Sequence, residues 1–164
     1  MPPPLSRPVL GPAAILAALA LLGGCGGGGD GTLTKAEFVA RGDEICKQAH
    51  EQFSQAQENP PNTPAGAAEL QRRLIEISEG ELSAIHDLEA PSDVRPALER
   101  YLGARERGIA LLKRGLEAAR QEDERAYAAA QARLAAGQLR RLKLARAVGF
   151  NECSVVASPA PGGG

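Results

Sequence analysis

Tryptophan is absent from this chain of 164 residues, and Phe and Tyr together number only five. Other residues that favour β-strands are scarce too, because only five Val, five Ile and three Thr lie beyond residue 24. This scarcity argues against a substantial sheet. Alanine occurs 30 times, and the remaining abundant residues, Leu, Glu, Gln and Arg, are helix formers. The composition therefore predicts an all-α fold.

The chain also lacks an excess of either charge and has few cysteines. Its 19 basic and 20 acidic residues give a formal net charge of −1, which provides no basic field for nucleic acid. Beyond residue 30 no apolar run is long enough to span a bilayer. Three cysteines are too few for a disulfide-rich miniprotein, and 43% hydrophobic residues are too many for a disordered chain. We expect one globular domain that binds no nucleic acid.

The N-terminus has the features of an export signal. One basic residue, Arg7, precedes the apolar stretch 9–22, which at about 14 residues is too short for a stable membrane span. The stretch ends in Leu22-Gly23-Gly24-Cys25, which resembles a bacterial lipobox, where the cysteine is lipidated and begins the mature protein. We therefore predict a signal peptide over 1–24, lipidation of Cys25, a glycine-rich tether over 25–33, and anchoring at the extracytoplasmic face of the cell membrane. The alternative is an ordinary secretory signal in which Cys25 is incidental.

Capping signals define the first two predicted helices. Thr34 and Glu37 fit a capping box, and the first helix should end near residue 58, before a Pro-Pro pair. Thr63 followed by Pro64 begins the second helix, which should end near residue 90. Its apolar stripe passes close to Glu81, an unexpected position for a charged residue.

The second half of the chain allows two arrangements. A third helix begins between residues 92 and 97, and one uninterrupted helix could continue to 148, about 78 Å long. A break with Asp123 as N-cap instead gives four helices of similar length, so that each can bury its apolar stripe. We choose this break, with Gly149 ending the fourth helix. The prediction is an antiparallel up-down-up-down four-helix bundle over residues 34–153, followed by a disordered tail over 154–164.

The two halves of the domain differ in charge. Residues 30–93 hold 13 acidic and 5 basic residues, whereas residues 95–146 hold 6 acidic and 13 basic residues. Attraction between neighbouring helices is the simpler interpretation. Alternatively, the basic half faces anionic lipid headgroups or an anionic envelope polymer.

Two short runs resemble those of uncharacterised lipoproteins from high-GC Gram-positive bacteria. The first is the Lys-Ala-Glu-Phe…Ile-Cys run over 35–46, and the second is Gly-Phe-Asn-Glu-Cys over 149–153. Gly42 replaces the alanine expected in the first run. The resemblance implies an exported location, a helical fold and a pair of cysteines, and it implies no activity.

Cys46 and Cys153 are the thiols left once Cys25 is lipidated, and an exported protein meets an oxidising environment. In the predicted bundle the last helix ends where the first begins, and the tail after Gly149 can fold back along the first helix toward Cys46, so we predict a disulfide between them. Two free thiols, or a metal site formed by these cysteines with His50 and His86, are the alternatives.

Motifs for catalysis or cofactor binding are missing from the sequence. It contains no Glu-x-x-His pair, haem-attachment motif, phosphate-binding loop or nucleophile elbow. The acidic run formed by Glu76, Glu79, Glu81, His86 and Asp87 is interpreted as a solvated helix face. We expect a non-catalytic interaction module without cofactor or metal, binding an envelope protein or an anionic polymer. The alternative is a helical carrier of a small ligand or metal.

Overall fold

The computed structural model describes residues 33–156, which are all helix, turn or irregular, without strands. The helices in this range are α1 (Lys35–Gln57), α2 (Pro64–His86), α3 (Arg95–Arg120), α4 (Glu124–Ala136), α5 (Gln138–Val148) and the 3-10 turn η1 (Glu152–Ser154). This confirms the predicted all-α class. None of these helices is long and apolar enough to cross a membrane.

Three of the predicted helix starts are confirmed in detail, and α3 begins at Arg95, within the predicted range but without a side-chain cap. The side chain of Thr34 accepts a hydrogen bond from the Glu37 amide, and the Glu37 carboxylate accepts one from the Thr34 amide at 2.9 Å. Thr63 caps α2 by accepting from the Gly66 amide, with Pro64 as the first helical residue. Asp123 caps α4 by accepting from the Ala126 amide. These caps satisfy amides that have no partner within the helix.

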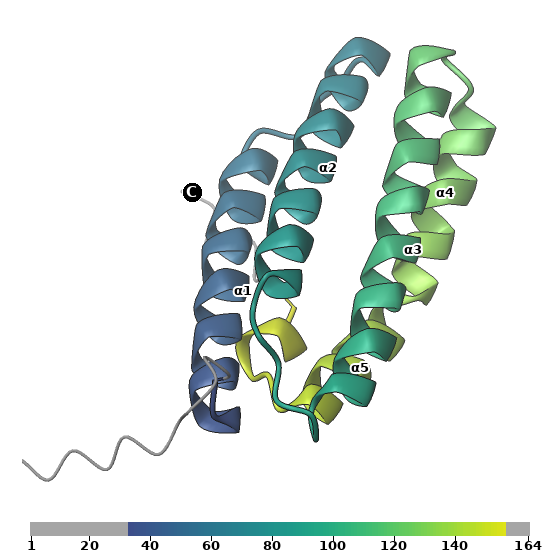
Figure 1. Ribbon diagram of the computed structural model, residues 1–164. Helices are drawn as coiled ribbons and strands as arrows, with labels where there is room; N and C mark the ends of the chain where they lie inside the picture. Colours follow the sequence, from purple (N-terminus) through teal and green to yellow (C-terminus); the bar gives the residue numbers. More distant parts are fainter. Residues whose placement is uncertain (1–32, 157–164) are drawn as a thin grey trace, which may run out of the picture.

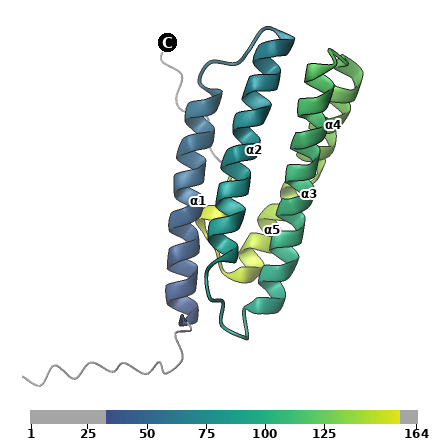
Figure 2. The ribbon, with the colours of Figure 1, turned by 45° about the horizontal axis from the view of Figure 1, so that its top comes forward.

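The helices pack side by side in sequence order, and the last of them lies near the start of the first (Figure 1). In Figure 1, α1 lies beside α2, α3 lies beside α4, and the shorter α5 lies at the end where α1 begins. Figure 2 shows the same neighbours from another angle. Helix α3 packs against α2, α4 and α5, whereas α1 and α4 do not pack along each other within the described chain. The side of the molecule between α1 and α4 is therefore more open than the others.

The predicted single fourth helix is wrong, because the structure divides it at Gly137 into α4 and α5. The guanidinium of Arg141 folds back across this point and donates a hydrogen bond to the Leu134 carbonyl oxygen at 3.0 Å. A Cβ at residue 137 would lie 2.8 Å from Nη1 of Arg141, so a larger residue there would require the guanidinium to shift. The change of direction brings α5 to the end of the molecule where α1 begins.

The buried core gathers at that end. Its members come from α1, α2, α3, α5 and the loops around them: Phe38, Cys46, Ile85, Ala90, Val94, Leu98, Tyr101, Ala145, Val148, Phe150 and Cys153. No residue of α4 belongs to this cluster. Away from this cluster the buried hydrophobic side chains are aliphatic, among them Ile75, Ile109, Leu112, Ala118, Ala119 and Ala130, and half-buried leucines lie beside them around the cavity described below.

Candidate functional site

The segment after α5 docks onto α1 through an aromatic ring. Gly149 ends α5 in the left-handed region, with φ 108°, as predicted for a C-terminal glycine. The Phe150 ring then lies on Gly42, where the Cζ atom would be 2.7 Å from an added Cβ. It also stacks on Phe38 and meets Tyr101 edge-on, with ring centroids 5.6 and 5.8 Å apart. Glycine at residue 42, unexpected from the resemblance, is thus required by Phe150.

Two further contacts fix this segment on α1. Asp43 accepts hydrogen bonds from the amides of Asn151 and Glu152 at 2.8 and 2.9 Å. Cys46 and Cys153 are joined by a disulfide with a Cα–Cα distance of 5.1 Å, which confirms the predicted pair. We call these contacts, together with that of Phe150, the terminal clamp. Ser154 is buried in η1, so the folded domain extends past the predicted boundary at 153.

The terminal clamp gives a structural reason for the residue types in the two runs that carry the family resemblance. Phe38, Gly42 and Cys46 lie on one face of α1, and each contacts a residue of the second run. In this chain both runs therefore have a structural role. Cys46 is bonded to Cys153, so it offers no thiolate to the metal site that was considered with His50.

A buried ion pair lies next to the disulfide. The Glu81 carboxylate accepts a hydrogen bond from the guanidinium of Arg105, and its side chain is only 5% exposed. Burial raises the pKa of Glu81, and the charge of Arg105 opposes this shift. Tyr101 donates to the same carboxylate at 3.5 Å, and burial raises the pKa of its hydroxyl. The interpretation of Glu81 as part of a solvated face is wrong, because α2 turns it toward α3.

The other members of the acidic run are exposed, as predicted: Glu76, Glu79, His86 and Asp87. His50 is half-buried, and its pKa is lowered first by burial and then by the charge of Arg105. In the described part of the chain, no three His, Cys, Asp or Glu side chains are grouped to hold a metal ion. Cys25 lies outside the described residues.

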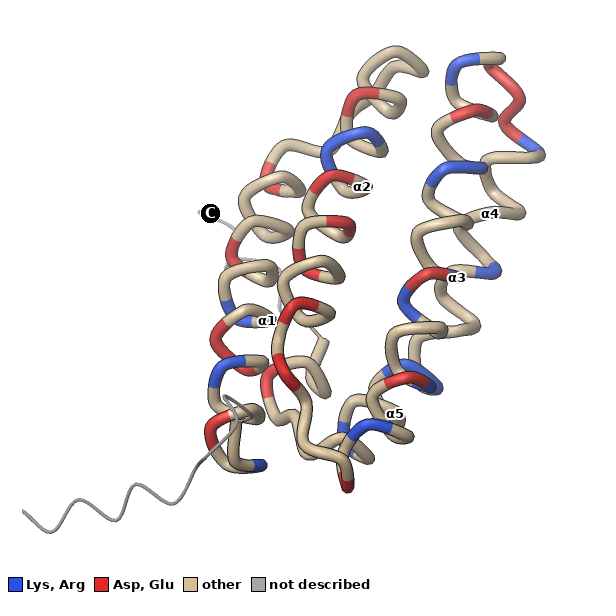
Figure 3. Tube along the Cα trace, viewed as in Figure 1, with Lys and Arg blue, Asp and Glu red and all other residues tan. Residues whose placement is uncertain are grey.

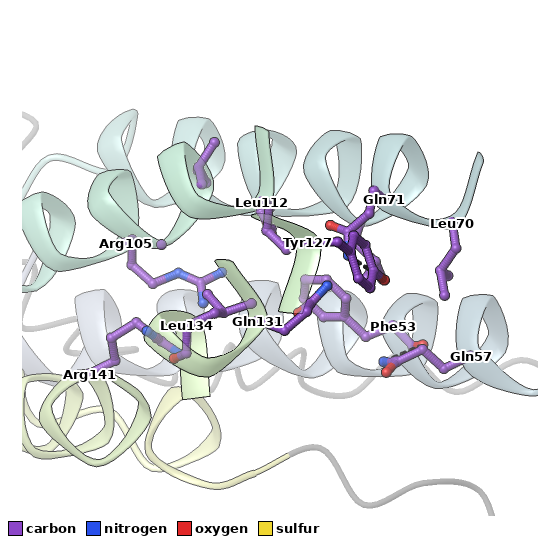
Figure 4. A pocket seen from close by; sticks show the side chains of 14 residues that line it. Phe53, Gln57, Leu70, Gln71, Arg105, Leu112, Tyr127, Gln131, Leu134 and Arg141 are labelled. Atoms are coloured by element: carbon purple, nitrogen blue, oxygen red, sulfur yellow. Dashed lines mark hydrogen bonds between the residues drawn. The ribbon is translucent and has the colours of Figure 1, made fainter. Parts of the chain in front are cut away.

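A cavity of about 420 Å³ occupies the open half of the molecule, between α1, α2, α3 and α4. Figure 4 shows its lining, in which two arginines stand at one end and glutamines gather toward the other. The apolar part consists of Phe53, Leu70, Leu74, Ile109, Leu112 and Leu134. The polar part consists of Gln57, Gln71, Ser78, Arg105, Tyr127, Gln131 and Arg141. Apolar walls with a few converging polar groups are typical of ligand pockets, and the volume falls in their usual range.

Gln71 is the most unusual residue of the lining. It is only 1% exposed, and its Nε2 donates to the hydroxyl oxygen of Tyr127 at 3.2 Å. Its carboxamide oxygen is buried without a hydrogen-bond partner in the described protein. Gly115 on α3 provides room for the carboxamide, because an added Cβ would already touch it at 3.5 Å. A buried unpaired acceptor costs about 1–3 kcal/mol, so a donor at this position would stabilise the protein.

Arg141 is the second unusual residue. It is half-buried between α3 and the end of α4, and it forms no ion pair with any described residue. Burial lowers its pKa, and the nearby charge of Arg105 lowers it further. Arg105 is neutralised by Glu81, so Arg141 brings an uncompensated positive charge to this end of the cavity. A second cavity, of about 280 Å³, shares both arginines, Phe53 and Gln57 with the first.

The charge difference between the two halves is visible in Figure 3, where acidic residues are frequent on α1 and α2 and α5 holds only basic ones. Two ion pairs link α2 to α3: Glu81 with Arg105, and Glu79 with Lys113 at 2.7 Å. The other eleven basic residues of 95–146 form no ion pair with the described chain. Attraction between helices therefore accounts for only part of the asymmetry.

The cavity has no signature in the sequence, because its polar members resemble ordinary surface residues. Gln71 and Gln131 occur among other polar residues on α2 and α4, and nothing nearby marks them as inward-facing. Glu81, close to an apolar stripe, was the only signal of a polar interior. Comparison of the chain with known protein families, with curated proteins and with solved structures finds no match.

Proposed function

We propose that this protein is a non-catalytic lipoprotein that binds a small ligand in the cavity of its helical domain. The observation that carries the proposal is Gln71, whose buried carboxamide oxygen lacks a donor in the wall of a cavity of about 420 Å³. Rotation of the carboxamide would bring this oxygen to the cavity surface, where a ligand hydroxyl or N–H group would donate to it. The proposal adopts the small-ligand alternative in preference to the interaction module.

The location is part of the proposal. The lipobox at Cys25 and the glycine-rich residues after it would hold the domain at the extracytoplasmic face of the membrane. The family of high-GC Gram-positive lipoproteins remains our proposed assignment, and the antiparallel up-down-up-down order is favoured by the short connections. A tethered domain with a pocket would capture its ligand close to the membrane and keep it there.

The anchor is tested with Cys25→Ala. We expect this variant to be released into the medium or to remain an unprocessed precursor, whereas the original chain fractionates with membranes. A Cys25→Ala protein that is processed and still membrane-bound would contradict the anchor.

The cavity is tested with a neutral apolar fluorophore, N-phenyl-naphthylamine, added to the full chain carrying Cys25→Ser, which is purified without detergent. We expect a saturable rise in fluorescence with one site per chain. Gly108→Leu should abolish it, because an added Cβ at residue 108 would point between Leu134 and Arg141 at 3.8 Å.

Gly80→Leu is the matched control, since an added Cβ there meets nothing within 4 Å. It should retain the full signal. Leu112→Phe provides a second way to fill the cavity if Gly108→Leu does not fold, as judged by circular dichroism. Unchanged binding in a folded variant with a filled cavity would contradict the proposal.

A surface role is the second candidate, and the eleven basic residues of 95–146 without ion pairs favour it. They would dock the tethered domain on anionic lipid, at about 1 kcal/mol for each basic residue near the surface. Co-sedimentation of the Cys25→Ser chain with vesicles containing phosphatidylglycerol should then weaken steeply with salt. Equal sedimentation with neutral vesicles would contradict this role.

A further inference from the structure

We propose that the ligand is a linear amphiphile with a carboxylate at one end and a hydroxyl or N–H group at the other, and that Arg141 binds the carboxylate. This inference rests on the proposed function, because it assigns a chemical class to the occupant of the same cavity. The cavity has three zones in sequence along its length, and each zone matches one part of such a molecule.

The first zone is built around the Arg141 guanidinium. One of its nitrogens donates to the Leu134 carbonyl oxygen, which fixes the group and leaves other N–H donors for a ligand. The side chain passes close to two glycines, because a Cβ at residue 137 would lie 2.8 Å from Nη1 and one at residue 108 would be in ordinary contact with Cδ at 3.8 Å. The half-buried guanidinium is held beside the cavity by this packing and by the Leu134 carbonyl oxygen.

The charge balance of this zone selects a single negative charge. Glu81 already compensates Arg105, so Arg141 alone lacks a counter-ion among the described residues. A carboxylate supplies one negative charge and fits the planar fork of a guanidinium with two parallel hydrogen bonds. A phosphate monoester would bring up to two charges at neutral pH, more than this zone can compensate.

The middle and far zones define the rest of the ligand. Leu112, Leu134 and Phe53 form the middle in Figure 4, where an alkyl chain would be shielded from water. Gln71 lies toward the opposite end of the lining from the two arginines in Figure 4. Its unpaired oxygen is buried, and rotation of the carboxamide toward the cavity would let it accept a hydrogen bond from the terminal hydroxyl or N–H group.

Three probes of equal chain length test the inference by calorimetry on the Cys25→Ser chain: ω-hydroxydecanoate, decanoate and decanediol. We expect ω-hydroxydecanoate to bind at least tenfold more tightly than decanediol, which lacks the carboxylate. Arg141→Gln should remove this difference. The exposed neighbour Arg140 supplies the control, and Arg140→Gln should retain the difference.

The other end is tested in the same way. Decanoate, which lacks the hydroxyl, should bind severalfold more weakly than ω-hydroxydecanoate, and Gln71→Leu should make the two equal. If decanediol binds as tightly as ω-hydroxydecanoate, or if Arg141→Gln leaves the preference intact, the carboxylate assignment is wrong while cavity binding stands. If none of the probes and no N-phenyl-naphthylamine binds, the proposed function fails together with this inference.

Discussion

The end of the domain that holds the terminal clamp (the clamped end) and the end that holds the cavity (the cavity end) are both built from α-helices. They differ in how their interiors are filled. At the clamped end aromatic rings, a disulfide and a capped turn occupy the centre, and Phe38, Tyr101 and Phe150 are at most 1% exposed. At the cavity end the leucines of the lining on α2 and α4 remain half-buried, and polar groups point inward. The aromatic core and the disulfide are therefore concentrated in one half of the molecule, and the cavity lies in the other.

Removal of the disulfide should have the largest effect on stability, while cavity binding at the other end is retained. It closes a loop of 107 residues, for which the chain-entropy account gives up to about 4.7 kcal/mol. Cys46→Ser with Cys153→Ser should lower the free energy of unfolding in urea by about 2–5 kcal/mol. N-phenyl-naphthylamine should still bind the folded fraction of this variant, because the cavity is lined by neither cysteine. Loss of cavity binding in the folded fraction would show that the two ends are coupled.

Two alanine substitutions of aliphatic residues on α2, one at each end, compare how much the two ends contribute to stability. Ile85 is 1% exposed in the core, whereas Leu74 is half-buried and lines the cavity. Ile85→Ala should cost about 2–5 kcal/mol, the usual range for a buried aliphatic residue. Leu74→Ala should cost less than half as much, since it removes less buried surface and enlarges an existing space. Urea denaturation of both variants measures this, and equal losses would contradict the comparison.

Gly42 and Gly80 should respond to alanine with opposite signs, because only Gly42 is covered by a neighbouring side chain. Gly42→Ala places a Cβ against the buried Phe150 ring and should cost about 1–3 kcal/mol. Gly80→Ala meets no neighbour and should stabilise α2 by about 0.5–1 kcal/mol. Thermal unfolding of the two variants gives both values. Combining Gly42→Ala with Phe150→Leu, which removes the clash, should recover part of the loss.

Sequence alone predicted the parts of this structure that depend on local chemistry. The caps at Thr34, Thr63 and Asp123, the left-handed Gly149 and the cysteine pair all follow from residue types and spacing. The division at Gly137 is not specified by the sequence, because an isolated glycine within a helical pattern is often tolerated.

The cavity could not be predicted for a related reason. A glutamine in an amphipathic helix has the same local signature whether it faces water or a pocket, and only the placement of α4 distinguishes the two for Gln71. The requirement for glycine at residue 42 likewise arises from a ring more than 100 residues away in the chain.

The smallest expected effect is the dependence of stability on pH through His50, which lies near the disulfide at the edge of the second cavity. Its pKa in the folded protein is below the usual value because of burial and the charge of Arg105, although Glu152 opposes the shift. The unfolded chain therefore takes up this proton at a higher pH than the folded protein. Stability should fall as the pH decreases through the ordinary pKa of histidine, near 6.5, toward the lower folded value. Urea denaturation across this range should show a shallower fall in His50→Gln than in the original chain. An unchanged profile in His50→Gln would mean that the imidazole is solvated in the folded protein and that this part of the clamped end is as open as the cavity.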